Sequence, residues 1–222
     1  MTRLGAVIFD FDGVILDSET PEYESHKQVF EMFGVPLSLD DYLRHVGLYH
    51  VDHETQWFMR LRAQSPAPPD RATFDAERKR IFDALVPREP MRGILDLLDA
   101  LTGAAVPMAI ASTSTSRWVV PAAERLGVRA RFATVVTGDD VERRKPAPDV
   151  YLEAARRLGV DPARSIAVED SAPGITSARA AGMKTVAIPH WLTERHDLSA
   201  ADLRVAHAGE LTLDRLATLL IP

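Results

Sequence analysis

The 222-residue sequence contains no cysteine. This absence excludes disulfide scaffolds, thiolate zinc sites, cysteine nucleophiles and thiolate-held iron–sulfur clusters. Long apolar runs are missing too, because the longest, near residues 104–111, is well short of the roughly 20 residues of a membrane-spanning helix. The short apolar run over residues 4–9 is interrupted by Asp10 and Asp12 before any small-residue cleavage site, so no signal peptide is expected. We therefore predict a cytoplasmic protein with no membrane partner.

An excess of positive charge is also lacking, since 26 Lys and Arg stand against 32 Asp and Glu, a formal net charge of −6. Phosphate backbones favour clustered Lys and Arg, so we expect no nucleic acid partner. A hydrophobic content of 46% with 26% charged residues is typical of a globular protein. The length predicts one large domain, or a core that carries a smaller insert.

Short β-rich runs alternate with segments of helical periodicity, which is the pattern of βα units that build a parallel sheet. We predict a three-layer α/β sandwich. Its strands are expected at residues 4–9, 106–111, 133–136, 165–168 and 184–188.

The stretch over residues 16–87 breaks this alternation, because it offers helices without a convincing strand between them. It is interpreted as an inserted helical domain, which leaves residues 1–15 and 88–222 for the α/β core. Thr20 is expected to cap the first helix, with Pro21 at its first position. Further helices are predicted from Ser38, over residues 52–64 and over residues 71–85.

Two carboxylates, Asp10 and Asp12, come at the end of the first predicted strand. Side chains alternate along a strand, so an extended backbone would point both carboxylates to the same side. The carboxyl ends of strands are also where open α/β sheets bind ligands. The alternative is a polar junction whose carboxylates cap nearby amides.

Three further polar groups follow later strands. The hydroxyl-rich turn over residues 112–116 precedes a helix whose amides attract an anion, although plain helix capping is the alternative. Lys145 precedes two prolines and a helix, and an isolated lysine is usually exposed. Glu169 and Asp170 supply a second carboxylate pair of the hard oxygen donors that suit Mg²⁺. Together these groups predict a site for a phosphate and a metal.

The motifs Asp10-Phe11-Asp12-Gly13-Val14, Ser112, Lys145 and Glu169-Asp170, in this order, resemble those of haloacid dehalogenase superfamily phosphatases. The similarity is to the group that contains β-phosphoglucomutase and small sugar-phosphate phosphatases. Similarity within residues 16–19, 145–151 and 168–181 extends it over nearly the whole chain. The resemblance implies a Rossmann-like parallel sheet and identifies the helical insert as a cap domain that closes over the substrate.

The resemblance also implies roles. Asp10 would attack phosphorus and become a phosphoaspartate, while Asp12 would protonate the leaving oxygen and later activate water. Ser112, Thr113 and Lys145 would bind the phosphoryl oxygens. Mg²⁺ would be held by Asp10, the Asp12 backbone carbonyl and Asp170, with Glu169 assisting directly or through water.

In the insert, Gly47, Tyr49 and His50 resemble part of the cap loop that contacts the substrate in related enzymes, although an Arg or Lys often stands near the place of His50. A zinc site at His45, His50 and His53 is disfavoured, because the spacing is not that of a helical ligand pair. Trp57 and Phe58 are expected in the core of the cap rather than at a sugar. The mixed charges of residues 75–80 are expected to face solvent.

Two other functions stay open. A phosphomutase would use the same chemistry, yet in β-phosphoglucomutase a histidine of the cap helix occupies the place that Glu22 takes here, so hydrolysis is favoured. Glu22 is a candidate specificity residue, or simply an acidic residue in the first turn of a helix. A non-catalytic sensor of a phosphorylated metabolite would not need Asp12. We predict a monomeric enzyme acting on a small phosphorylated metabolite.

Overall fold

The computed structural model describes residues 4–44 and 53–221. The chain divides into two compact units, one of residues 1–17 and 88–222 and one of residues 18–87. We call them the sheet unit and the helical unit.

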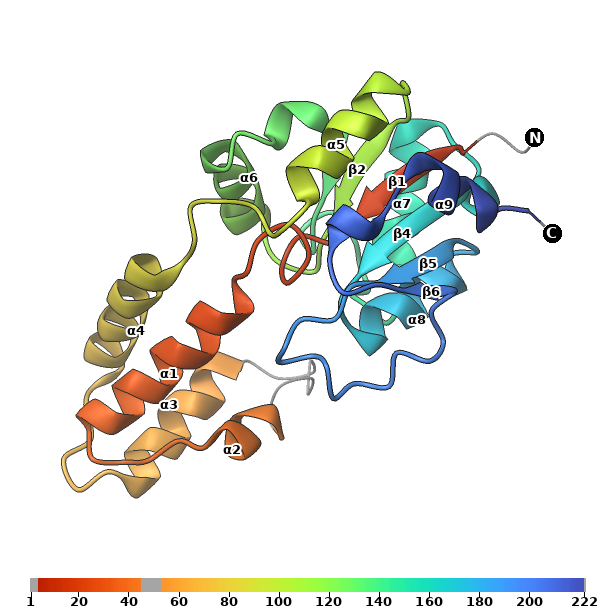
Figure 1. Ribbon diagram of the computed structural model, residues 1–222. Coiled ribbons are helices and arrows are strands. Elements are labelled where there is room, and N and C mark those ends of the chain that lie inside the picture. The colour runs from red at the N-terminus through yellow and green to blue at the C-terminus, as the bar shows by residue number, and fades with distance from the viewer. Residues whose placement is uncertain (1–3, 45–52, 222) are drawn as a thin grey trace. The chain divides into compact units, whose positions relative to one another are not determined.

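The sheet unit is built on a parallel sheet with the strand order β3-β2-β1-β4-β5-β6 (Figure 1). β1 is central, pairing with β2 on one side and β4 on the other. β1 and β4 are buried along their whole length, in keeping with the apolar residues 6–9 of β1 and 166–168 in the middle of β4. Five strands lie within two residues of their predicted limits, and the two-residue β6 was not predicted. The strands are Ala6–Phe9, Met108–Ala111, Thr134–Val136, Ser165–Glu169, Lys184–Ala187 and Leu203–Arg204.

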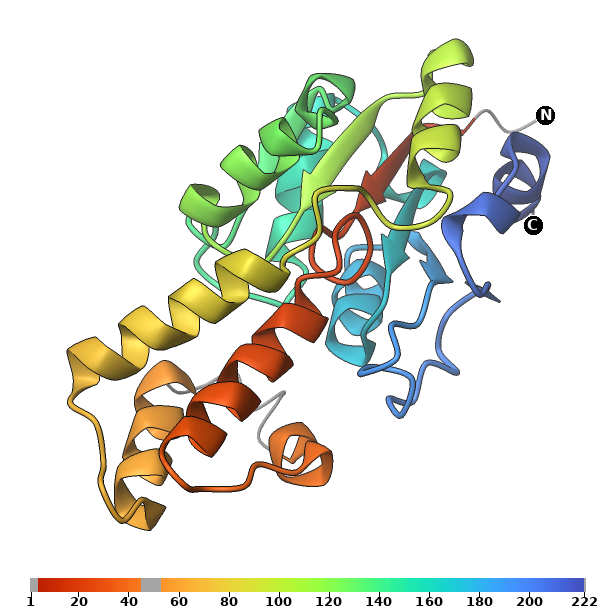
Figure 2. The same ribbon diagram turned by 60° about the vertical axis from the view of Figure 1, so that its left-hand side comes forward.

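Helices cover both faces of this sheet. In both ribbon views α7 and α8 lie on one face and α5 and α9 on the other (Figures 1 and 2). The predicted three-layer α/β fold is therefore confirmed. The helices of this unit are α5 (Ile94–Gly103), α6 (Ser116–Arg125), α7 (Asp149–Leu158), α8 (Ala172–Ala180) and α9 (Leu213–Thr218), with short 3-10 turns at Arg129–Arg131, Pro162–Arg164 and Ala208–Glu210.

The helical unit contains α1 (Glu19–Met32), α2 (Leu39–Leu43), α3 (His53–Gln64) and α4 (Arg71–Leu85). The predicted start of α1 was wrong, because Ser18, not Thr20, precedes its first residue, so Pro21 occupies its third position. Proline is tolerated there because a first-turn amide has no partner within the helix. At α2, the helix predicted from Ser38, the Ser38 hydroxyl caps the first turn by accepting the amide hydrogen of Asp41 at 3.1 Å.

Aromatic side chains form the interior of the helical unit. Trp57 and Phe58 are both buried, as predicted. The Trp57 ring stacks on Tyr42 at a centroid distance of 5.4 Å, and Phe58 packs against Phe74 at 5.6 Å. Such pairs add packing energy beyond the apolar area that they bury.

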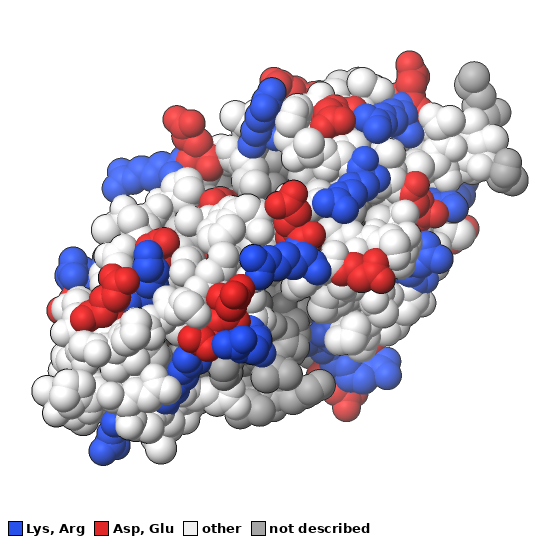
Figure 3. All heavy atoms as spheres, turned by 60° about the horizontal axis from the view of Figure 1, so that its bottom comes forward, with Lys and Arg blue, Asp and Glu red and all other residues white. Residues whose placement is uncertain are grey.

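None of the helices that the structure describes is both long and apolar enough to span a bilayer. On the face drawn in Figure 3, basic and acidic side chains are interspersed, in keeping with the small net charge of −6.

Candidate active site

The polar residues singled out in the sequence follow neighbouring parallel strands, so the sheet brings them to one edge. Asp10 follows β1, and its amide continues the ladder by donating to the Val168 carbonyl at 2.9 Å. Asp170 follows β4, the neighbour of β1. Ser112 follows β2, and its amide donates to the Val136 carbonyl at 3.0 Å.

A buried lysine joins two of these carboxylates. The Lys145 Nζ lies 2.8 Å from Oδ1 of Asp10 and 2.6 Å from Oε1 of Glu169. It also lies 5.0 Å from the centre of the Tyr151 ring. Burial opposes the ammonium charge, yet the two carboxylates outweigh burial and raise the pKa of Lys145 above its usual value. Lys145 is therefore a fixed cation in contact with Asp10, and it is not the exposed lysine of the alternative interpretation.

The Asp10 carboxyl group is buried beside several other charged groups. Its pKa is raised to about 7, because burial, together with the carboxylates of Glu169 and Asp12, outweighs the Lys145 ammonium, which lowers it. One carboxylate oxygen from each of Asp10, Glu169 and Asp170 lies within 4.8 Å of the others. Crowded acidic oxygens of this kind are stabilised by a cation, so this donor set could hold a divalent metal.

Glu169 is held rigidly. It is fully buried, and its Oε1 accepts a hydrogen bond of 2.5 Å from the Tyr151 hydroxyl in addition to the contact with Lys145. On its other side a Cβ added at Gly174 would lie 2.0 Å from the Glu169 carboxylate, so only glycine leaves room there. Glu169 therefore fixes the position of the Lys145 cation beside Asp10.

Asp170 is fixed from two directions. The Thr193 hydroxyl donates to its Oδ2 at 3.1 Å. Gly13 approaches from the first motif with a φ of +77°, and a Cβ there would lie 2.5 Å from the same oxygen. Glycine is required at position 13 by both the left-handed backbone and the close approach.

Asp12 is held by residues that follow β2. Its Oδ1 accepts the indole N–H of Trp118 at 2.8 Å, and its Oδ2 accepts the Ser114 hydroxyl at 2.6 Å. The Ser112 hydroxyl is 3.4 Å from the same Oδ2 and accepts the amide hydrogen of Ser114 at 3.0 Å. Thr113 is half-buried in this turn. The structure thus brings Ser112 beside Asp12, and Lys145 against Asp10.

Sequence reasoning did not single out Trp118, Tyr151 or Thr193. Trp118 and Tyr151 lie on helices that follow the recognised motifs, and Thr193 lies in the loop after β5. A single indole, phenol or hydroxyl carries no sequence signal for a site, because its function depends on which carboxylate it meets in the fold.

Of the candidate cap residues, Gly47, Tyr49 and His50 lie outside the described residues, and so does His45. His53 is the first residue of α3. The structure therefore describes one candidate of this group, Glu22.

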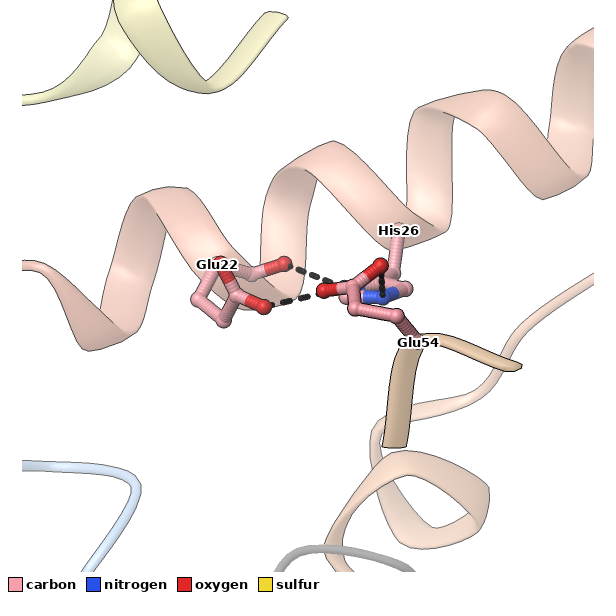
Figure 4. Close-up of side chains that lie close together, drawn as sticks. All are labelled: Glu22, His26 and Glu54. Carbon is pink, nitrogen blue, oxygen red and sulfur yellow. Dashed lines mark hydrogen bonds and ion pairs between the residues drawn. The ribbon is translucent and has the colours of Figure 1, made fainter. Parts of the chain in front are cut away.

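Glu22 belongs to a cluster of charged side chains in the helical unit (Figure 4). Arg78 donates to Oε2 of Glu22 at 2.9 Å and contacts Oε1 of Glu54 at 2.8 Å. Nδ1 of His26 lies 2.9 Å from the Glu22 backbone carbonyl, which can only accept, so this nitrogen carries the hydrogen. Burial raises the pKa of Glu54 to about 7, against the influence of Arg78.

Glu22, His26 and Glu54 each offer a possible metal ligand, and the three atoms lie within 4.8 Å of one another. Arg78, however, already supplies a positive charge to both carboxylates. A divalent cation would have to displace or repel this guanidinium. The arrangement favours an ion network that joins α1, α3 and α4.

The sequence and fold of this chain are similar to those of known proteins. The profile of the family described as "Haloacid dehalogenase-like hydrolase" matches residues 7–188. This chain belongs to that family. The predictions of superfamily and of an enzyme are thereby confirmed.

Relatives match over most of their length. The chain is 34% identical to YhcW of Bacillus subtilis over 94% of each chain. It is 29% identical to the "Phosphorylated carbohydrates phosphatase" of Thermotoga maritima, over 82% of this chain and 83% of that protein. The crystal structure of CbbY from Rhodobacter sphaeroides in complex with phosphate aligns with a TM-score of 0.75 and 27% identity, over 97% of this chain and 100% of that one.

Proposed function

We propose that this protein is a Mg²⁺-dependent phosphatase that hydrolyses small phosphomonoesters, in particular sugar phosphates. The observation that carries the proposal is the contact of 2.8 Å between the buried Lys145 ammonium and Asp10 at the end of β1. A carboxylate can attack an anionic phosphoryl group only where cations offset the repulsion. The names of two relatives support the substrate class, since one is a phosphatase of phosphorylated carbohydrates and CbbY was crystallised with phosphate.

In the proposed reaction a carboxylate oxygen of Asp10 bonds to phosphorus while the bond to the ester oxygen breaks. Asp12 gives its proton to the departing oxygen, which leaves as an alcohol. Asp12 then takes a proton from water as that water attacks phosphorus, so inorganic phosphate departs and the Asp10 carboxylate is restored. Lys145, with Ser112 and Thr113 of the turn after β2, binds the non-bridging phosphoryl oxygens.

The donor set of the site fits Mg²⁺, because the grouped ligand atoms are all hard carboxylate oxygens. Asp10, Asp170 and the backbone carbonyl of Asp12 would hold the ion. When bound, it supplies positive charge to the phosphoryl oxygens. Glu169 would assist through water, since its Oε1 already contacts Lys145 and Tyr151.

Hydrolysis is favoured over phosphoryl transfer between sugar hydroxyls. Glu22 occupies the cap-helix position at which the mutase has a histidine, and its carboxylate pairs with Arg78. His26, one turn later on α1, is only 1% exposed and lies among Tyr42, Trp57 and Phe74, so it does not replace that histidine.

The proposal is tested by incubating the protein with Mg²⁺ and a panel of phosphorylated metabolites beside a chromogenic aryl phosphate. We expect release of inorganic phosphate, abolished by excess EDTA. With β-glucose 1-phosphate and catalytic glucose 1,6-bisphosphate, any accepted sugar should yield glucose and phosphate. Accumulation of glucose 6-phosphate with little free phosphate would assign a mutase. No turnover of any phosphomonoester would favour a sensor.

A further inference from the structure

Both carboxylate oxygens of the proposed acid/base Asp12 accept hydrogen bonds from the segment over residues 114–118. The Trp118 indole holds Oδ1 at 2.8 Å, and the Ser114 hydroxyl holds Oδ2 at 2.6 Å. A carboxylate bound at both oxygens cannot rotate about its terminal bond without losing both contacts. The turn before α6 and the first residues of this helix therefore determine the orientation of the Asp12 carboxylate.

The two donors differ in their chemistry. An indole N–H can only donate, whereas a hydroxyl can donate or accept. The oxygen that faces Trp118 is therefore held as an acceptor. A proton on the other oxygen, Oδ2, can be accommodated, because the Ser114 hydroxyl can turn and accept it.

We propose that Trp118 is a positioning residue for Asp12, which orients the carboxylate and directs its catalytic proton to Oδ2. The inference rests on the proposed function, because it assigns Asp12 to general acid and base chemistry. Proton transfer requires a donor within hydrogen-bond reach and in the right direction, so a loss of orientation should slow this step selectively.

Leaving-group basicity provides the test. The poorly basic oxygen of p-nitrophenyl phosphate departs with little need of a proton, whereas the alkoxide of glycerol 3-phosphate or of a hexose phosphate needs one. Trp118→Phe keeps an aromatic ring and removes the N–H. Hydrolysis of the phosphoenzyme is common to both substrates, so the release of the leaving group is measured in a single turnover. We expect the release of the alcohol from an alkyl phosphate to slow about tenfold and the release of p-nitrophenol to change less than about twofold.

Three further variants serve as comparisons and as a control for Trp118→Phe. Asp12→Asn should show the same selectivity in leaving-group release with a larger loss, and it should also slow hydrolysis of the phosphoenzyme formed from either substrate. Ser114→Ala should show the selectivity through the other oxygen even if Trp118→Phe fails to fold. Trp191→Phe is the matched control, because it removes an indole that is 44% exposed and packs near His190. We expect this control to match the unmodified protein on both substrates.

A second readout does not depend on activity. The chain has three tryptophans, so an NMR spectrum of the indole N–H groups should contain three signals. Trp118→Phe identifies its own signal by removing it. We expect Asp12→Asn to shift that signal strongly and to leave the Trp191 signal in place, because the Trp118 indole donates to the altered carboxylate.

Each outcome separates the inference from the proposed function. If Asp12→Asn selectively slows leaving-group release from alkyl phosphates but Trp118→Phe slows that release equally for both substrates, the indole acts in packing and the inference is overturned. A Trp118→Phe variant faster than the unmodified protein on alkyl phosphates would overturn it too, since the indole would then hold Asp12 away from the substrate. If Asp12→Asn is as active as the unmodified protein on both substrates, the proposed function fails and the inference fails with it, whatever the indole signal does.

Discussion

Two clusters in this protein place one cation between two carboxylates, and they differ in burial and in the kind of cation. In the sheet unit Lys145 joins Asp10 and Glu169, whose side chains are 12% and 0% exposed. In the helical unit Arg78 joins Glu22 and Glu54, whose side chains are 34% and 31% exposed. The same combination of charges thus occurs in two environments.

The two clusters use different cations, lysine in the buried cluster and arginine in the more exposed one. The Lys145 ammonium is a compact charge that meets one oxygen of each carboxylate, whereas the Arg78 guanidinium reaches two partners with separate N–H groups. In the buried cluster little water screens the charges, and burial is the main cause that raises the pKa of Asp10. In the more exposed cluster the ion pairs connect three helices. On the proposed function, similar pairing supports chemistry in the sheet unit and structure in the helical unit.

The largest effect is expected from the proposed nucleophile. Asp10→Asn is nearly isosteric, so the fold should persist while turnover of an aryl phosphate falls by about 10⁴-fold or more. Glu54→Gln is the matched change in the other cluster and should stay within about twofold of the unmodified protein. Single-turnover rates with circular dichroism as a folding check measure both, and near-normal hydrolysis by Asp10→Asn would remove it as nucleophile.

The second largest effect is expected from replacing the two cations. Lys145→Met leaves Asp10 and Glu169 without their counter-charge, and we expect a loss of about 10²- to 10³-fold in kcat/KM. Arg78→Met should retain aryl phosphatase activity but lower the free energy of unfolding by about 1–3 kcal/mol. Steady-state kinetics and urea denaturation check the pair, and equal activity losses would mean that the two clusters share one role.

A smaller effect is expected from Thr193, whose hydroxyl orients Asp170. Thr193→Val should raise the Mg²⁺ concentration for half-maximal activity several-fold with little change in activity at saturating Mg²⁺, because a hydrogen bond that orients a metal ligand strengthens metal binding. Thr193→Ser keeps the hydroxyl and is the control. The same shift in both variants would point to packing rather than to the hydrogen bond.

The smallest effect concerns pH in the helical unit. The pKa of Glu54 rises on folding from its ordinary 4.5 to about 7, so the folded protein holds the proton more tightly than the unfolded chain between these values. Stability should therefore fall by about 1 kcal/mol as pH rises through this window, after allowance for solvent screening.

Glu54→Gln should flatten this slope. Trp57 fluorescence in a Trp118→Phe, Trp191→Phe background reports unfolding of the helical unit alone, with urea titrations at pH 5, 6 and 7. An unchanged slope in Glu54→Gln would assign the pH dependence to another group.

The sequence by itself predicted five of the six strands that the structure describes, the helical insert, and the grouping of Asp10, Ser112, Lys145 and Asp170 as candidate site residues. It could do so because apolar periodicity is local and because the ends of parallel strands meet at one edge of a sheet. The start of α1 was misplaced, since Ser18 and Thr20 are both plausible helix-start residues and sequence alone does not decide between them.

Only the tertiary structure decided which partners these residues meet. Trp118 binds a carboxylate 106 residues before it, and Arg78 binds one 56 residues before it. An indole or a guanidinium on a helix looks the same in sequence whether it faces solvent or a buried carboxylate. Its role is determined by packing, because burial in a low-dielectric interior and the chain segment opposite give its hydrogen bonds their strength and direction.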